Sequence, residues 1–273
     1  GLLALVKGQP HRPDGAAGGP PLLVLAARPR APRAALGAVL AARTADVFDL
    51  RGKSLNGRYK LLENGEAQVT AATQLVGGIS LIIGDSKGGL AQWFMARDTD
   101  GEQRLKQIRT FQMGTTPIVE ITAEERRKGF TALDASGKFG VFHSTAHRTL
   151  LVDQVVEGQG LFGLSPRANR VIVEAGGKLQ PLLLDNPHPE VSWSALWSKV
   201  WYENYDEPKY VWQSTAANTD FEPKLSLSPL TFGTLKAAFY AMLLAAPLAV
   251  AAAIYTAYFM APGMRRKVKP VIE

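Results

Sequence analysis

The feature that most constrains this sequence is an uncharged, apolar run near its C-terminus. From Ala237 to Gly263 there are 27 consecutive residues without a charged side chain. The hydrocarbon core of a bilayer is about 30 Å thick and is crossed by about 20 apolar residues as an α-helix. Pro247 lies inside the run, and proline is tolerated in membrane-spanning helices, where it kinks the helix axis. The run therefore predicts a transmembrane helix over residues 231–263, with a kink at Pro247.

Side chains suited to membrane–water boundaries surround this run. Lysine can extend its ammonium group toward the headgroups, and tyrosine and tryptophan combine an apolar ring with a polar tip. Three indoles recur at every fourth residue in the stretch 191–230, so a helix would carry them on roughly one face. We therefore expect this stretch to be an aromatic linker at the membrane interface, or else to close off the core of the preceding domain. The predicted interface anchors are Trp193, Trp197, Trp201, Lys236, Tyr255 and Tyr258.

Positive charge is concentrated directly after the run. Residues 264–273 contain Arg265, Arg266, Lys267 and Lys269, whereas the comparable stretch before the run contains only Lys224 and Lys236. The positive-inside rule then predicts that the flank 264–273 is cytoplasmic. The expected location is the bacterial inner (plasma) membrane, with the portion before the helix on the periplasmic side.

The middle of the chain, residues 44–190, is built from short apolar runs separated by turn clusters. Three segments share one pattern, in which an apolar run, a polar glycine turn and a second run follow one another. Aligning Gly88, Gly137 and Gly177 gives spacings of 49 and 40 residues. Repeats of about 40–50 residues with several strands each are typical of propeller blades. We therefore expect a partial β-propeller with WD40-like blades. Three blades do not close a ring that typically needs 4–8, so further blades are expected outside this chain.

Residues 1–43 differ from the rest in composition. They consist almost entirely of Ala, Leu, Gly, Pro and Arg, and repeated prolines interrupt any helical or strand period. Two interpretations stay open: a disordered low-complexity tail, or out-of-frame translation of GC-rich DNA. The predicted fold class is thus mainly β, followed by an α-helical transmembrane segment and preceded by a disordered N-terminal tail.

Charge and motifs argue against several functional classes. Of the net charge of +7, residues 1–43 carry +5, residues 264–273 carry +3 and residues 44–263 carry −1. The middle therefore has no basic excess for nucleic acid. The chain has no cysteine, which excludes a thiolate site. Gly158–Gly163 matches G-x-G-x-x-G formally, but no helix is expected to follow. His143 and His147 are interpreted as surface histidines rather than metal ligands. We therefore expect no enzyme, no cofactor and no metal.

The C-terminal fifty residues resemble a known family. Pro229–Met242, Ala253–Pro262 and Arg266–Glu273 are similar to phosphate-type (Pst-like) ABC importer permeases of the long proteobacterial form. That form carries a propeller-like periplasmic insertion, and Trp201–Gln213 looks like the segment before its core. The resemblance implies that the chain is a fragment of a permease subunit for inorganic phosphate or a related oxyanion, with its transport-site residues outside the chain.

The resemblance also implies partners. They would be a second permease subunit, cytoplasmic ATPase subunits, a periplasmic phosphate-binding protein and the lipid bilayer, without nucleic acid. The docking loop for the ATPase would lie beyond this chain. The alternative function is a membrane-tethered β-propeller for binding or sensing, with one helix as its tether and no transport role.

Overall fold

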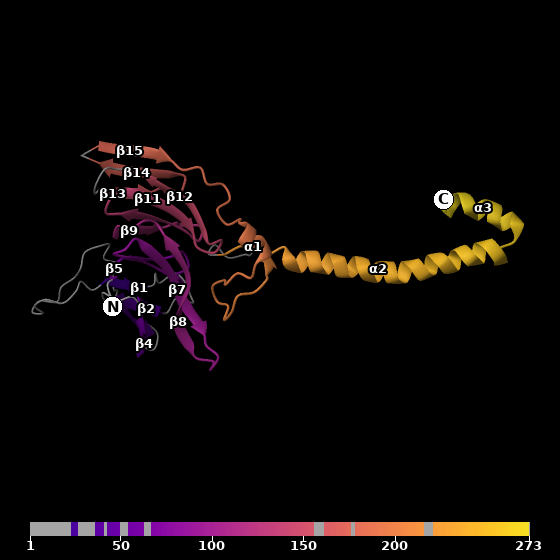
Figure 1. Ribbon diagram of the computed structural model, residues 1–273, viewed down its shortest axis with the longest axis horizontal. Coiled ribbons are helices and arrows are strands. Elements are labelled where there is room, and N and C mark those ends of the chain that lie inside the picture. Colours follow the sequence, from indigo (N-terminus) through magenta and orange to yellow (C-terminus); the bar gives the residue numbers. More distant parts are fainter. Residues whose placement is uncertain are drawn as a thin grey trace, which may run out of the picture. The chain divides into compact units, whose positions relative to one another are not determined.

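A computed structural model shows a strand-rich unit followed by a helical one (Figure 1). The structure describes residues 23–26, 36–40, 43–49, 54–62, 67–155, 161–175, 178–215 and 221–272. The chain divides into two compact units, residues 1–226 and 227–273. The first contains all the strands of the described residues, and the second contains the long apolar helix.

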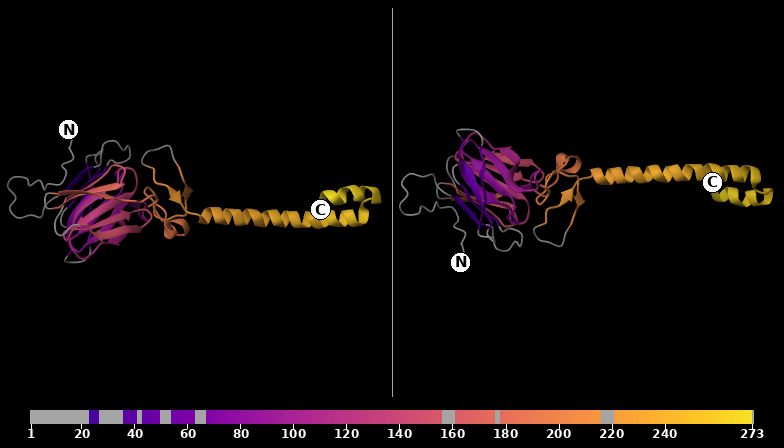
Figure 2. Two further views of the ribbon diagram at one scale, coloured as in Figure 1. Left: turned by 90° about the horizontal axis from the view of Figure 1, so that it is seen from above. Right: turned by 90° about the horizontal axis from the view of Figure 1, so that it is seen from below.

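Among the described residues, the strands form five antiparallel sheets (Figure 2). We call the first four along the chain blades 1 to 4, and the fifth is a short two-stranded sheet near the start of the helical unit. In each blade, consecutive strands are neighbours. Blade 1 contains β1 (Leu23–Ala26), β2 (Leu36–Leu40), β3 (Thr44–Asp49) and β4 (Ser54–Lys60). Blade 2 contains β5 (Val69–Gln74), β6 (Leu81–Asp85), β7 (Gly89–Arg97) and β8 (Gln103–Gln112). Blade 3 contains β9 (Ile118–Ala123), β10 (Gly129–Asp134), β11 (Lys138–His143) and β12 (Arg148–Gln154). Blade 4 contains β13 (Leu161–Leu164), β14 (Arg170–Ala175) and β15 (Lys178–Leu183).

The glycine turns that align in the sequence are equivalent hairpins in blades 2 and 3. Gly88 and Gly137 have φ values of 75° and 88°, which glycine adopts without steric cost. Asp85 Oδ1 accepts backbone hydrogen bonds from Lys87 and Gly89 at 2.7 and 2.8 Å. Asp134 Oδ1 does the same with the N–H groups two and four residues further on, both at 2.9 Å. The repeat therefore has a structural basis in one turn chemistry. The third aligned glycine, Gly177, lies outside the described residues.

The hydrophobic core lies between the blades. Blades 2 and 3 each pack apolar side chains against a neighbour on both sides, as successive propeller blades require. Leu40 of blade 1 packs in one cluster with Ile83 and Trp93 of blade 2. A second cluster joins blades 2 and 3, where the Phe130 and Phe142 rings stack with centroids 5.2 Å apart. A third cluster joins blades 3 and 4. The predicted mainly β, propeller-like fold followed by an apolar helix is confirmed.

The N-terminal boundary of the blades differs from the prediction. β1 and β2 fall within residues 1–43, which the composition marks as a low-complexity tail. Both are short aliphatic runs, β1 between Pro21 and Pro29 and β2 after Pro32. β2 pairs with β3 from Leu36 opposite Asp49 to Leu40 opposite Ala45. Apolar runs of this length suffice for a strand once a neighbour supplies the pairing. The blades therefore begin before residue 44, and the rest of residues 1–43 lies outside the described residues.

The second unit consists of helices. α2 (Ser228–Ile254) continues into η1 (Tyr255–Phe259), a π-helical turn, and both form one apolar helix of 32 residues. Pro247 lies within α2, and the kink predicted there stays a prediction. Met260 adopts an extended conformation that ends the helix, and α3 (Pro262–Ile272) follows. The apolar helix therefore ends at Phe259 rather than at residue 263, and the flank predicted over 264–273 is mostly α3.

Candidate functional site: the linker segment and the membrane helix

The chain between blade 4 and α2 contacts blades 2 and 3. We call its described part, residues 191–215 and 221–226, the linker segment. It contains α1 (Trp193–Trp197) and the paired strands β16 (Trp212–Gln213) and β17 (Lys224–Leu225). The hydroxyl of Ser192 accepts from the Ala195 N–H at 3.0 Å and donates to the Ala146 carbonyl, also at 3.0 Å. One residue thus caps α1 and attaches it to blade 3.

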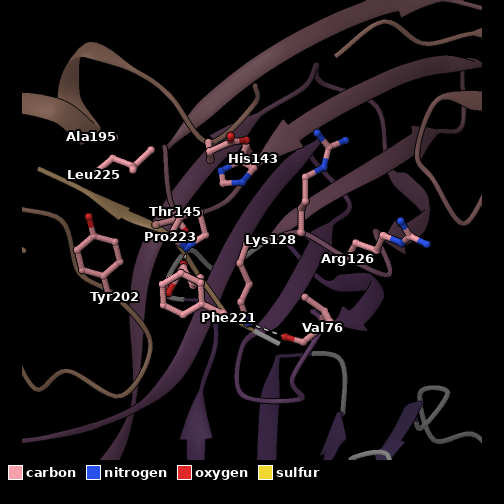
Figure 3. A pocket seen from close by; sticks show the side chains of 13 residues that line it. Val76, Arg126, Lys128, His143, Thr145, Ala195, Tyr202, Phe221, Pro223 and Leu225 are labelled. Carbon is pink, nitrogen blue, oxygen red and sulfur yellow. Dashed lines mark hydrogen bonds between the residues drawn. The ribbon is translucent and has the colours of Figure 1, made fainter. Parts of the chain in front are cut away.

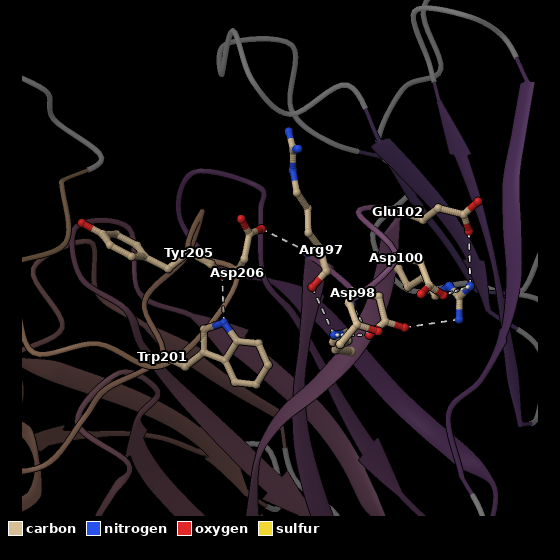
Figure 4. A network of polar contacts seen from close by, with 10 residues as sticks. Arg97, Asp98, Asp100, Glu102, Trp201, Tyr205 and Asp206 are labelled. Carbon is tan, nitrogen blue, oxygen red and sulfur yellow. Dashed lines mark hydrogen bonds and ion pairs between the residues drawn. The ribbon is translucent and has the colours of Figure 1, made fainter.

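The predicted helical face of three indoles is wrong. α1 ends at Trp197 because Ser198 leaves the helical conformation. The side chains of Trp193 and Trp197 are exposed. Trp201 instead lies edge-to-face against Phe94 of blade 2, with ring centroids 6.1 Å apart, and its Nε1 donates to the Tyr205 carbonyl at 2.8 Å (Figure 4). Trp201 therefore closes the propeller core, which was the alternative interpretation of this aromatic stretch.

A buried ion pair joins the linker segment to the blades. The Lys128 Nζ lies 2.6 Å from a carboxylate oxygen of Glu203. It also donates to the Val76 carbonyl at 2.6 Å (Figure 3). The exposed fractions of the two charged side chains are only 4% and 6%. A buried charge is costly without its partner, so this pair can form only when the linker segment is seated on the blades.

Further hydrogen bonds attach the linker segment along its length. Arg109 of blade 2 donates to the Trp201 carbonyl at 2.6 Å, while its second nitrogen donates to Gln92 at 2.8 Å. Arg148 donates to the Val191 carbonyl at 2.6 Å. The backbone N–H of Arg97 donates to Asp206 at 3.1 Å, as Figure 4 shows. These bonds come from both blade 2 and blade 3, so the linker segment is attached to both of these blades.

A second carboxylate lies beside the ion pair. Thr145 donates to Glu222, whose other oxygen accepts from the Glu203 N–H at 3.4 Å. Desolvation and the neighbouring charge of Glu203 raise the pKa of Glu222 to about 7. Two carboxylates that compete for the same cations cannot both ionise cheaply. Glu222 is therefore the member that takes up a proton below neutral pH.

The two histidines have different environments. His143 is buried, which corrects its interpretation as a surface residue, and its Nδ1 accepts from the Ala146 N–H at 3.2 Å. Burial and nearby arginines lower the pKa of His143 to about 3, so the ring is neutral. His147 is exposed and lies 2.9 Å from the Thr110 carbonyl through its Nε2. Among the described residues, no cluster of potential metal ligands occurs.

A pocket of about 140 Å³ lies where the linker segment meets blade 3 (Figure 3). Its walls include Lys128, His143 and Thr145 from blade 3 and Tyr202 and Glu222 from the linker segment. Desolvation raises the pKa of Tyr202 to about 12, so its phenol stays protonated. The charged groups Lys128 and Glu222 already bond to other protein groups. The pocket is therefore part of the linker attachment.

The long apolar helix follows the linker segment in the chain. Ser226 is buried and its N–H donates to the Val211 carbonyl at 3.0 Å, and α2 begins at Ser228. The apolar helix of 32 residues is about 48 Å long at 1.5 Å per residue, and none of its residues is buried. Lys236 lies over the Tyr240 ring at 5.8 Å. From Lys236 to Phe259 the helix spans about 35 Å, close to the thickness of a bilayer core.

The distal end of the helix carries the predicted tyrosines. Tyr255 and Tyr258 both lie in η1 and are exposed, and Tyr255 stacks on Phe259 with centroids 6.4 Å apart. Arg265 donates to the carbonyls of Ala257 and Met260, which the π-turn and the helix end leave without regular helical partners. The aromatic rings and an arginine thus gather at one helix end, as they do at membrane interfaces.

These features define a mainly β, propeller-like protein that carries one helix long and apolar enough to cross a membrane. No protein-family profile matches the chain, and no curated protein matches it. Among solved structures, it is similar to Sqt1 from Chaetomium thermophilum, with 16% identity and a TM-score of 0.43 over 55% of this chain and 39% of that one. A second structure shows the same Sqt1 bound to the N-terminus of the ribosomal protein L10. Its identity is again 16% and its TM-score 0.43, over 55% of this chain and 42% of that one. The chain thus spans about two fifths of the proteins that it matches.

The prediction of a phosphate-importer permease is wrong. The solved structures described above are both of Sqt1, and no comparison supports a transporter. The C-terminal resemblance described above and the partners that it implied stay predictions, because no comparison tests them. The tethered-propeller alternative agrees better with the findings.

Proposed function

We propose that this protein is a membrane-tethered β-propeller that serves as a binding or sensing module. The observation that carries the proposal is the apolar helix from Ser228 to Phe259, none of whose residues is buried. Only Leu227 separates it from Ser226, the last bonded residue of the linker segment.

The energetics of this helix favour a lipid environment. Fourteen large apolar side chains along it are exposed: Leu230, Phe232, Leu235, Phe239, Tyr240, Met242, Leu243, Leu244, Leu248, Val250, Ile254, Tyr255, Tyr258 and Phe259. Removing such side chains from water gains about 1.5 kcal/mol each or more, or roughly 20 kcal/mol together. That exceeds the usual stability of a whole domain, about 5–15 kcal/mol. Water is therefore a poor solvent for this helix, and a bilayer is a good one.

Charge supports an orientation for the tether. Arg265, Arg266 and Lys267 follow the helix, and Lys269 continues the basic stretch. By the positive-inside rule, this end faces the cytoplasm and the blades face the other side. In a bacterial inner membrane, the propeller would then be periplasmic.

Extraction of membranes at alkaline pH tests the tether. We expect the full chain to stay in the membrane pellet after carbonate treatment. A variant with Leu244→Arg and Leu248→Arg places two charges near the centre of the helix, at about 2.5–3.5 kcal/mol each for insertion, and should appear in the supernatant. The matched control, Leu244→Ala with Leu248→Ala, keeps the helix apolar and should stay in the pellet. Release of the unmodified protein by carbonate would overturn the proposal.

A further inference from the structure

α3 has one apolar side and one basic side. A helix turns about 100° per residue, so Met264, Val268 and Val271 lie within about 60° of one another around its axis. Met264 and Val271 are 63% and 85% exposed and Val268 is half-buried, so the described residues leave most of this apolar side uncovered. Arg266 projects roughly opposite to them, and its side chain is exposed. α3 is therefore an amphipathic helix whose apolar side lacks a protein partner among the described residues.

The start of α3 is fixed at the end of the membrane helix. The extended conformation of Met260 breaks the helix, and α3 begins two residues later at Pro262. Arg265, in the first turn of α3, donates to the Ala257 and Met260 carbonyls. In hydrocarbon, carbonyls without partners are costly, so a cation bonded to them places these residues near the headgroups. Figure 1 shows α3 running in a different direction from α2.

We infer that α3 lies along the membrane surface and binds anionic lipid headgroups. This inference rests on the proposed tether and adds a lipid class to it. The charge pattern identifies the partner, because residues 237–272 contain four cationic side chains and no acidic one. Basic amphipathic helices insert their apolar side at the boundary between headgroups and acyl chains, and their cations attract anionic lipids.

Fluorescent labelling of the full chain in nanodiscs tests this arrangement. The chain has no cysteine, so single substitutions give unique labelling sites. We propose a polarity-sensitive probe at Val268→Cys on the apolar side, with Arg266→Cys as the matched control on the opposite side. The probe at 268 should be quenched by lipids with spin labels near the headgroups, and the probe at 266 by iodide in the water. Replacing part of the phosphatidylcholine with phosphatidylglycerol should increase lipid quenching at 268 by about twofold or more.

Charge removal tests the lipid specificity. With the probe at 268, the variant Arg266→Gln with Lys267→Gln should lose most of the increase that phosphatidylglycerol causes. Inorganic phosphate added to pure phosphatidylcholine nanodiscs should not reproduce that increase. Equal iodide quenching at 266 and 268, or quenching that is independent of anionic lipid, would overturn the inference. A probe at Leu244→Cys separates the two claims: lipid quenching at 244 with an aqueous 268 refutes only the inference, and an aqueous 244 refutes the tether itself.

Discussion

The buried ion pair between Lys128 and Glu203 offers the sharpest test of how the linker segment is attached. We consider the single variants Lys128→Met and Glu203→Gln and the double variant. Lys128 and Glu203 are only 4% and 6% exposed, so each single variant leaves one buried charge without its partner. Breaking a buried pair by removing one partner costs about 3–5 kcal/mol, whereas replacing both partners is often nearly neutral. Two single losses of about 3 kcal/mol each sum to about 6 kcal/mol, so a double variant that loses less than half of this sum gives a coupling of at least about 3 kcal/mol.

The measurement is a double-mutant cycle on the free energy of unfolding. Urea titration of the full chain in detergent micelles, followed by tryptophan fluorescence, reports on the blades and on Trp201 of the linker segment. The matched control is the exposed pair Lys209–Glu207 at 3.3 Å, whose coupling should stay within about 1 kcal/mol. Additive effects of Lys128→Met and Glu203→Gln would show that the pair does not attach the linker segment.

Three further changes have defined outcomes. Gly88→Ala would place a Cβ 2.6 Å from the Gly114 carbonyl oxygen, at a φ of 75°. Gly101→Ala has a similar φ of 80° but open space around the new Cβ, so Gly88→Ala should lower the melting temperature more. Equal losses of melting temperature would contradict this. Because the pKa of His143 is lowered, the free energy of unfolding should increase as pH rises from about 3 to about 6.5. His143→Gln should flatten this increase in urea titrations, and an unchanged pH profile would refute the role of His143. The raised pKa of Glu222 acts in the opposite sense, because its stabilising effect is full below about 4.5 and is lost as pH approaches 7. The effect of Glu222→Gln on stability, relative to the unmodified chain, should therefore be more favourable at pH 7 than at pH 4.5. The reverse trend would exclude a raised pKa for Glu222.

Local chemistry explains which features the sequence could predict. The hairpins at Gly88 and Gly137 depend on residues within four positions of one another, so their repeat is visible in the chain itself. The apolar helix is likewise a local property of length and composition. Both were predicted because neither needs knowledge of distant contacts.

Tertiary contacts explain what the sequence did not predict. Lys128 and Glu203 are 75 residues apart, and neither lies in a motif that signals a buried pair. The neutral, buried state of His143 depends on packing by several elements, not on its neighbours in sequence. Trp201 has the spacing of a helical face, but α1 ends at Trp197, and contact with Phe94 of blade 2 decides its position. Periodicity alone could not distinguish these outcomes.

The central claim is that the chain crosses the membrane once between the blades and α3. Labelling of single cysteines with a membrane-impermeant maleimide on spheroplasts tests it directly, using Asp100→Cys at the exposed tip of the β7–β8 hairpin and Lys267→Cys in α3. We expect position 100 to be labelled in intact spheroplasts and position 267 to be labelled only after lysis. Labelling of both positions before lysis would contradict the claim, as would protection of position 100.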